Sequence, residues 1–361
     1  MGPYYWTIAL VTVFTLLAER FSNRRGTEIR PFRRETIAAK TCLFFAVGVL
    51  IFVAGCRFRV GTDYGAYYKG LTVYGDQFEK AIRSFDEPGL PLLAVIIRQF
   101  TDDGAYFVFA CSLITIALFM KTAYKNEKDY CFSTLLFILA GMWTGTFNGV
   151  RQFLASAILF AGHRYIYEKK FWKYLFTVFL AASFHISAVV MIVLYFLLRN
   201  RITVRNTILL AVGTAIVSAN YDAIFSFIGF LKDSDVSTMT EYKTTAVNTL
   251  RILVACAPAV TCLIIYYKKE LTAEQTFYIN SIIIHGAGMI AASNSAYLAR
   301  IGIYTSPFII IAIPKLIHMK DKLVERVSRL GITLLYAIYC YIDISVRSSL
   351  NHFQWIWERV L

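Results

Sequence analysis

Apolar runs of membrane length recur from one end of the chain to the other, separated by short polar segments. Because a helix needs about 20 mostly apolar residues to cross a bilayer, the pattern predicts an all-α polytopic membrane bundle of about 12 spans. No polar interval leaves room for a separate soluble domain, so residues 1–361 are expected to form a single integral membrane domain. The expected spans lie near 4–19, 38–56, 104–120, 131–148, 150–167, 172–184, 186–198, 206–230, 249–267, 275–292, 301–317 and 330–346.

One stretch, 171–198, decides how many times the chain crosses the membrane. As one straight helix it would measure about 42 Å, which is long for one span and short for two. A single crossing would place the basic loops at Arg199 and Lys315 outside, against the positive-inside rule. We therefore predict two short spans, with His185 at the outer turn between them.

The net charge of +14 follows from this topology. With two crossings in that stretch, most of the 37 Lys and Arg residues fall on inner loops, and the outer loops are close to neutral. Both termini are then expected outside, with membrane lipid around the bundle. Short split basic loops form no contiguous basic face, so no nucleic acid is expected as a partner.

Small residues within the apolar runs are interpreted as packing positions. The seven cysteines lie in or at the ends of these runs and form no C-x-x-C pair. Gly141, Gly145 and Gly149 repeat every fourth residue and predict a smooth close-packing face on the fourth span. The five histidines are too scattered to suggest a metal site, so we expect neither a metal nor a cofactor.

The longest outer loop, 57–103, begins directly after a span with the run R-F-R-V-G-T-D-Y-G-A-Y-Y. Charged residues at the mouth of a membrane helix are costly unless they bind something. Further along the loop, Pro88-Gly89-Leu90-Pro91 opens an apolar stretch that is too short to span. It predicts a re-entrant or interfacial helix near 88–100 that lines a cavity.

Polar residues from distant parts of the chain fall on this outer side and suggest an anion-binding site. Arg59, Arg151 and Arg300 come from separate outer loops and could converge on phosphate oxygens, because guanidinium forms bidentate, permanently charged hydrogen bonds. Alternatively, each arginine anchors its helix at the headgroup layer. The remaining expected pyrophosphate-binding or substrate-binding residues are Arg57, Tyr67, Asn148, Gln152 and Tyr297.

Three residues on the same side are candidate catalytic bases: Asp63, Glu87 and His185. A carboxylate or an imidazole can take the proton of a substrate hydroxyl during a group transfer. Each also has a structural interpretation. Asp63 could pair with an arginine, Glu87 could belong to a helix start, and His185 could be a neutral turn residue. The sequence does not rank them.

Five short motifs follow one another along nearly the whole chain: R-x-G-T-D-Y-x-x-Y from Arg59, E-P-G from Glu87, N-x-x-R-Q from Asn148, F-H-x-S-A from Phe184 and Y-x-x-R from Tyr297. In this order they resemble the EpsG family of polysaccharide polymerases. The first and third motifs are moderately specific, whereas F-H-x-S-A alone would be weak.

The resemblance implies a Wzy-like polymerase of the bacterial inner membrane, related to the C-type glycosyltransferases. Such a protein would join oligosaccharide repeat units carried on undecaprenyl pyrophosphate, at the outer face of that membrane, in exopolysaccharide or capsule biosynthesis. A chain-length regulator and a flippase are further expected partners. The alternatives are a transporter or flippase of lipid-linked glycans, and a non-catalytic subunit of the assembly complex. A transporter needs ionisable residues through the membrane, where we expect only His285.

Overall fold

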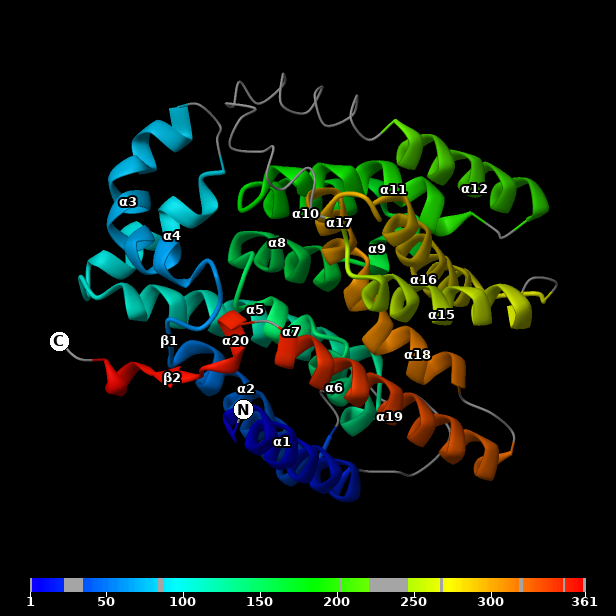
Figure 1. Ribbon diagram of the computed structural model, residues 1–361, viewed down its shortest axis with the longest axis horizontal. Coiled ribbons are helices and arrows are strands. Elements are labelled where there is room, and N and C mark those ends of the chain that lie inside the picture. Colours follow the sequence, from blue (N-terminus) through cyan, green and yellow to red (C-terminus); the bar gives the residue numbers. More distant parts are fainter. Residues whose placement is uncertain are drawn as a thin grey trace. The chain divides into compact units, whose positions relative to one another are not determined.

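The chain folds into helices and one small sheet, which Figure 1 shows in a computed structural model. The structure describes residues 2–22, 35–83, 87–200, 203–220, 246–266, 269–317, 321–346 and 348–359. These residues form two compact units. Unit 1 comprises 1–163, 172–189 and 313–361, and unit 2 comprises 164–171 and 190–312.

Unit 1 contains most of the N-terminal half and the C-terminal end of the chain. Its helices pack α1 against α2, α2 against α5, and α1 against α6. The elements are α1 (Gly2–Phe21), α2 (Ile37–Gly55), β1 (Arg57–Phe58), α3 (Tyr64–Arg83), α4 (Gly89–Arg98), α5 (Gly104–Asn126), α6 (Tyr130–Leu139), α7 (Met142–Gly145), α8 (Val150–Ala161), α10 (Phe171–Ala182, whose first residue belongs to unit 2), η2 (Ile186–Val189), α19 (Lys322–Val346), α20 (Ser348–Asn351), β2 (Gln354–Trp355) and η5 (Ile356–Glu358).

Two long apolar helices of unit 1 begin at side-chain caps. The Thr36 hydroxyl accepts a hydrogen bond from the Ala39 amide at the start of α2, over 3.1 Å. The Asp103 carboxylate accepts one from Ala105 at the start of α5, over 3.0 Å. Such caps satisfy amides that have no partner inside the helix. The loops therefore determine where each helix begins.

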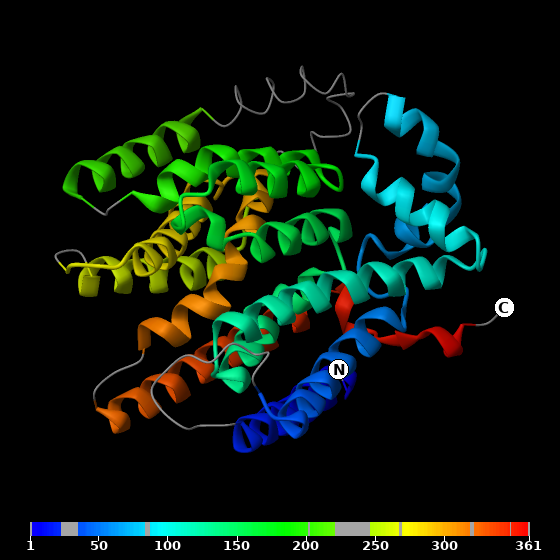
Figure 2. The ribbon, with the colours of Figure 1, turned by 180° about the vertical axis from the view of Figure 1, so that it is seen from behind.

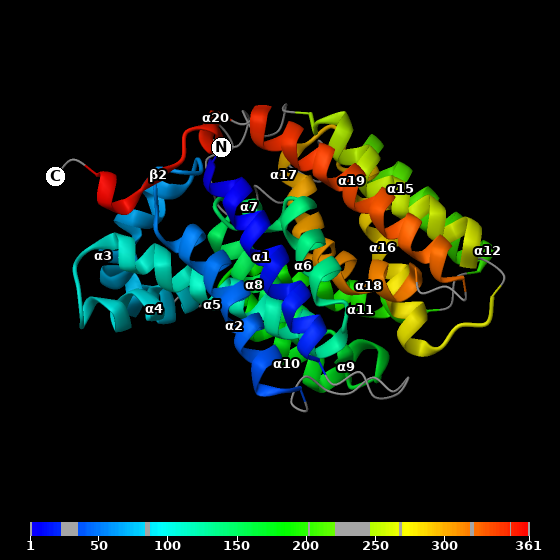
Figure 3. The ribbon, with the colours of Figure 1, turned by 90° about the horizontal axis from the view of Figure 1, so that it is seen from below.

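The C-terminal segment returns to the end of α2. Strand β2 pairs antiparallel with β1, so that Trp355 lies opposite Arg57, and Figure 2 shows the red segment beside the blue one. The Arg359 guanidinium pairs with the Asp103 carboxylate at 2.7 Å. The start of α1 lies at the same end, because the Tyr4 hydroxyl donates to the Leu350 carbonyl over 3.0 Å (Figure 3). Both chain ends therefore share one end of unit 1.

The opposite end of unit 1 holds a buried ionic network. The Tyr130 hydroxyl donates to Glu35 over 3.1 Å, and Arg329 of α19 pairs with both Asp129 and Glu325. Glu35 and Glu325 are buried. Because a buried carboxylate is costly unless it is paired, these contacts hold α19 against the start of α6.

Unit 2 is built around α15 and α16, which pack along each other, with α11 and α12 against α16. The start of α16 is a capping box between Thr272 and Gln275. The described elements of unit 2 are α9 (Arg164–Tyr167), α11 (Val190–Arg199), α12 (Val204–Ala219), α15 (Thr249–Tyr266), α16 (Ala273–Ala291), α17 (Ala296–Ala299), η3 (Arg300–Tyr304), η4 (Ser306–Phe308) and α18 (Ile309–Ile317), whose last residues belong to unit 1.

Five helical stretches in the described part of the chain are long and apolar enough to cross a membrane. They are Ile37–Gly55, Gly104–Asn126, Thr249–Tyr266, Arg300–Ile317 and Lys322–Val346. Several other apolar helices are shorter, including α6, α8 and α10. The described part of the chain is thus of the predicted all-α class apart from one short strand pair, and it has helices that could cross a membrane, while the number of about 12 spans stays a prediction.

Two local expectations can be compared directly with the helices. The stretch 171–198 is broken, since α10 ends at Ala182 and a short 3-10 turn precedes α11, so His185 lies at a turn as expected. The prediction of a continuous glycine face on the fourth span was wrong. Gly141 and Gly149 adopt positive φ angles of 77° and 38° and interrupt the predicted fourth span, because a left-handed residue ends a helical run.

The loop 57–103 also differs from the expectation. It contains the short helix α4 near the predicted 88–100, and in addition the 20-residue helix α3, which was not predicted. The later part of the predicted span 206–230 falls outside the described residues, and so does the side chain of Tyr297.

Candidate functional site

Glu87 links three segments of unit 1 through its two carboxylate oxygens. Oε2 pairs with the Arg151 guanidinium at 2.5 Å. Oε1 accepts the backbone amide of Ile186 at 2.8 Å and lies 3.0 Å from Nδ1 of His185. The α3–α4 loop, the start of α8 and the turn after α10 therefore meet at one carboxylate.

The E-P-G motif explains how Glu87 reaches this position. Glu87 has a positive φ of 46°, and Pro88 then precedes the first turn of α4. The Gly89 amide donates to the Ser183 carbonyl over 2.7 Å, and a Cβ at Gly89 would come within 2.9 Å of that oxygen. Only glycine allows α4 to approach the turn at His185 so closely.

The electrostatics of this cluster keep Glu87 ionised. Burial would raise the pKa of the Glu87 carboxyl, but the hydrogen bond to His185, the charge of Arg151 and the amide of Ile186 together hold the pKa below its usual range. An ionised carboxylate only accepts hydrogen bonds, so Nδ1 of His185 carries the donated proton. In the neutral ring, Nε2 is then the nitrogen with a free electron pair.

A second set of contacts positions Arg151 by joining the first motif to the third. The Gly149 amide, just before α8, donates to the Asp63 carboxylate over 3.0 Å. The Asn148 side-chain oxygen accepts the Thr62 amide over 2.7 Å and the Thr62 hydroxyl over 3.1 Å. Asp63 thus satisfies an amide at the start of α8, the helix whose first turn carries Arg151.

Gly61 and Tyr67 complete this junction. Gly61 has a φ of 96°, and a Cβ there would approach the Phe147 carbonyl to 2.7 Å. The backbone amide of Arg151 donates to the Tyr67 hydroxyl over 3.4 Å, and the ring of Tyr67 is buried with Leu71, Leu90 and other apolar residues. Gln152, beside Arg151, is also buried.

Arg57 has a different setting from the phosphate-facing position that the sequence suggested. Its side chain is 1% exposed. The guanidinium donates to the carbonyls of Ala54, Val60 and Phe147 and to the Ser112 hydroxyl. These donors are used inside the protein, where they tie the end of α2 to α5 and to the turn before α8. We therefore leave Arg57 out of the candidate site.

Arg59 and Arg300 are both exposed, and they belong to segments other than the three that meet at Glu87. Arg59 has a φ of 53°, and its guanidinium lies 5.3 Å from the ring centre of Phe58. Arg300 begins η3 in unit 2. Convergence of Arg59, Arg151 and Arg300 on one ligand stays a prediction, as does a ligand role for Tyr297.

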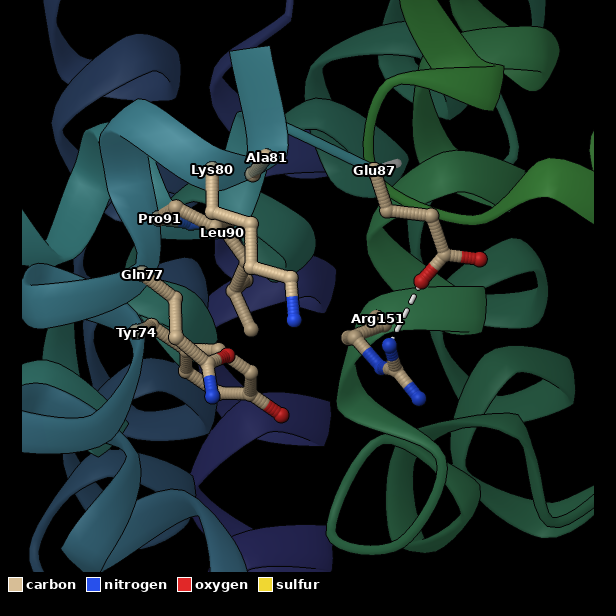
Figure 4. A pocket seen from close by; sticks show the side chains of 8 residues that line it. All are labelled: Tyr74, Gln77, Lys80, Ala81, Glu87, Leu90, Pro91 and Arg151. Carbon is tan, nitrogen blue, oxygen red and sulfur yellow. Dashed lines mark hydrogen bonds and ion pairs between the residues drawn. The ribbon is translucent and has the colours of Figure 1, made fainter. Parts of the chain in front are cut away.

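A cavity of about 280 Å³ adjoins the pair of Glu87 and Arg151 (Figure 4). Its other wall is α3, which contributes Tyr74, Gln77 and Lys80 at successive turns. None of these three was singled out from the sequence. The apolar residues after Tyr64 are spaced as in a helix, and this spacing could have predicted the helix that carries these three residues.

Within the described ranges, no group of three His, Cys, Asp or Glu side chains is placed to hold a metal ion. The imidazole, the carboxylates and the guanidinium described above can transfer protons and stabilise charge.

Comparison with known proteins identifies the family but gives no named relative. The EpsG family model matches residues 40–356, a range that includes all five motifs. No curated protein and no solved structure matches the chain. Because the match covers most of the sequence, the chain belongs to the EpsG family.

Proposed function

We propose that this protein is a glycosyltransferase that polymerises polysaccharide repeat units carried on undecaprenyl pyrophosphate. Membership of the EpsG family and the apolar helices support a membrane protein of polysaccharide assembly. The observation that carries the finer proposal is the bridge from Arg151 through Glu87 to His185, beside a cavity. In this bridge Arg151 supplies a cation that can stabilise a leaving pyrophosphate, and His185 supplies a base that can take the proton of an acceptor hydroxyl.

At the anomeric carbon of the donor sugar, the proposed reaction forms one bond and breaks one bond. The acceptor oxygen bonds to the anomeric carbon of the donor sugar, and the bond from that carbon to the pyrophosphate oxygen breaks with its electron pair. The hydroxyl proton passes to Nε2 of His185, while Arg151 stabilises the charge that develops on the pyrophosphate. Glu87 orients the imidazole through Nδ1 and stabilises its protonated form.

The contacts favour His185 over the two carboxylates as the base. Both oxygens of Glu87 are occupied by Arg151, Ile186 and His185. Asp63 accepts the amide of Gly149 and thereby supports the start of α8. A base needs an acceptor atom that is not already used within the cluster, and Nε2 of His185 is not the nitrogen that contacts Glu87. We place this reaction at the outer face of the bacterial inner membrane, with a flippase and a chain-length regulator as partners.

The test is chain extension by the purified protein in lipid vesicles supplied with lipid-linked repeat units. Arg151→Lys and His185→Asn should each abolish extension. Lysine cannot form the bidentate hydrogen bonds of a guanidinium to phosphate, and an asparagine side chain is not a base at neutral pH. Arg83→Ala is the control, because Arg83 is 83% exposed on α3 and pairs only loosely with Glu79 at 3.8 Å.

Full extension by Arg151→Lys and His185→Asn would refute the assignment of catalysis to this cluster. The alternative functions give different readouts in the same vesicles. A flippase would move labelled repeat units across the bilayer without lengthening them, and a non-catalytic subunit would do neither.

A further inference from the structure

The cavity beside Arg151 has a polar wall that the reaction described above does not use. Tyr74, Gln77 and Lys80 lie three residues apart on α3, so each successive turn places a polar group on the cavity side. Figure 4 shows the Lys80 ammonium and the Tyr74 hydroxyl directed into the space that faces Arg151. Two cationic side chains therefore flank the cavity from opposite walls.

The charge balance of the cavity favours an anion. Among the described residues that line the cavity, Lys80 and Arg151 each carry a positive charge, and Glu87 is the only carboxylate. The Glu87 carboxylate contacts Nη1 of the Arg151 guanidinium. The guanidinium has further N–H donors, and phosphate oxygens are ligands that suit both its fork and a lysine ammonium.

The size of the cavity limits the ligand to a small group. At about 280 Å³ it lies at the lower edge of the range of about 300–1,000 Å³ that holds drug-sized ligands. A pyrophosphate group or one sugar ring fits such a space, whereas an oligosaccharide repeat unit does not. Leu90 and Pro91 of α4 add apolar surface to the wall, and a less polar surrounding strengthens electrostatic contacts.

The helices on two sides of this cavity, α3 and α4, are packed against each other. The α3–α4 hairpin is joined by an ion pair between Asp76 and Arg98 at 2.5 Å, and Leu71 and Leu90 are buried in the core beneath it. Helix α3 thus places Lys80 on the wall across from Arg151.

We infer that this cavity is the site of the donor's pyrophosphate group, held between Lys80 and Arg151, with Tyr74 and Gln77 as additional hydrogen-bonding groups. The inference rests on the proposed function for the identity of the donor. It adds a second phosphate-binding cation that belongs to none of the five motifs, and it makes α3 the element that positions the leaving group.

Binding of inorganic pyrophosphate to the full-length protein in nanodiscs tests the site directly, by isothermal titration calorimetry. Lys80→Gln should weaken binding at least about tenfold, the loss expected when one charged hydrogen bond is removed. Lys80→Arg should restore most of the affinity. Lys69→Gln is the matched control, because Lys69 is an exposed lysine on the same helix that does not line the cavity.

Equal affinity of the wild type and Lys80→Gln for pyrophosphate would overturn the inference. So would a preference of the wild type for glucuronate, a sugar carboxylate, over pyrophosphate. A parallel extension assay separates this failure from failure of the proposed function. If Lys80→Gln extends chains with unchanged KM and kcat, the pyrophosphate lies elsewhere and the polymerase assignment stands. If pyrophosphate binding depends on Lys80 but the wild type extends no chains, the anion site stands and the polymerase assignment fails.

Discussion

Replacing Glu87 by glutamine should separate the catalytic role of this carboxylate from its structural role. The Glu87 side chain is 11% exposed and contacts Arg151, His185 and the amide of Ile186. Glutamine keeps the shape and one acceptor oxygen but removes the charge. Its amide group can also donate to Nδ1 of His185, which would place the ring proton on Nε2 and block the base.

The expected loss of stability can be worked from these contacts. Charged hydrogen bonds contribute about 1.5–3 kcal/mol each, but the amide of Ile186 keeps an acceptor in the glutamine variant. The Arg151 side chain is 38% exposed, so solvent screening reduces the value of its ion pair to about 0–1 kcal/mol. We expect Glu87→Gln to lower the free energy of unfolding by about 2 kcal/mol.

The expected loss of activity is larger. A misplaced proton removes general-base catalysis, which is worth about 10²–10⁴ in rate, so kcat should fall by that factor. Extension of lipid-linked repeat units by the reconstituted protein measures kcat, and denaturant titration in detergent measures stability. Glu79→Gln is the control, since Glu79 is 86% exposed on α3.

The pH dependence gives an independent check. The folded-state pKa of Glu87 lies below its usual value, so its stabilising contribution is complete above the ordinary glutamate range. It is lost as the pH falls through the folded-state pKa. The stability difference between wild type and Glu87→Gln should therefore be constant near neutral pH and shrink on acidification. Unchanged kcat in Glu87→Gln, or a difference that grows in acid, would refute the reasoning.

Three further predictions address the supporting residues and the topology. Asp63→Asn should retain most of the activity, because its amide oxygen can still accept the amide before α8, whereas loss of extension by a folded Asp63→Asn protein would make Asp63 the base. Gly89→Ala should cost about 1–3 kcal/mol of stability and reduce kcat by forcing α4 away from Ser183, while Gly65→Ala, whose Cβ would meet nothing within 4 Å, should not reduce kcat. Cysteine-accessibility labelling should report one membrane side for the outer residues and the other for Arg30, and labelling of position 185 from the inner side would contradict the two-crossing topology. The outer positions to be labelled are 63, 151, 185 and 300.

The break at His185 and the grouping of distant motifs could be predicted from the sequence. The length of 171–198 and the placement of basic loops require a turn there, and the structure has one. Charge placement also put Glu87, Arg151 and His185 on one side, where the structure brings them into contact. The grouping could be predicted because each motif adjoins an apolar run, so the predicted spans determine the membrane side of each motif.

Other features depended on tertiary contacts that the sequence pattern does not express. Glycines spaced four apart suggested a smooth helical face, but backbone conformation at Gly141 and Gly149 breaks the helix instead. The burial of Arg57 depends on carbonyls from residues as distant as Phe147. Helix α3 was missed because its Gly-rich and Tyr-rich start was taken for a loop, although Tyr64, Tyr67 and Leu71 already have helical spacing.

The central claim is that this chain itself makes glycosidic bonds from lipid-pyrophosphate donors. Vesicles that contain only the purified protein and labelled lipid-linked repeat units test it most directly, with glycan length and released undecaprenyl pyrophosphate measured together. The account predicts a ladder of lengthening chains and one undecaprenyl pyrophosphate released for each new bond. Repeat units that stay at their original length, with no release of undecaprenyl pyrophosphate, would contradict it.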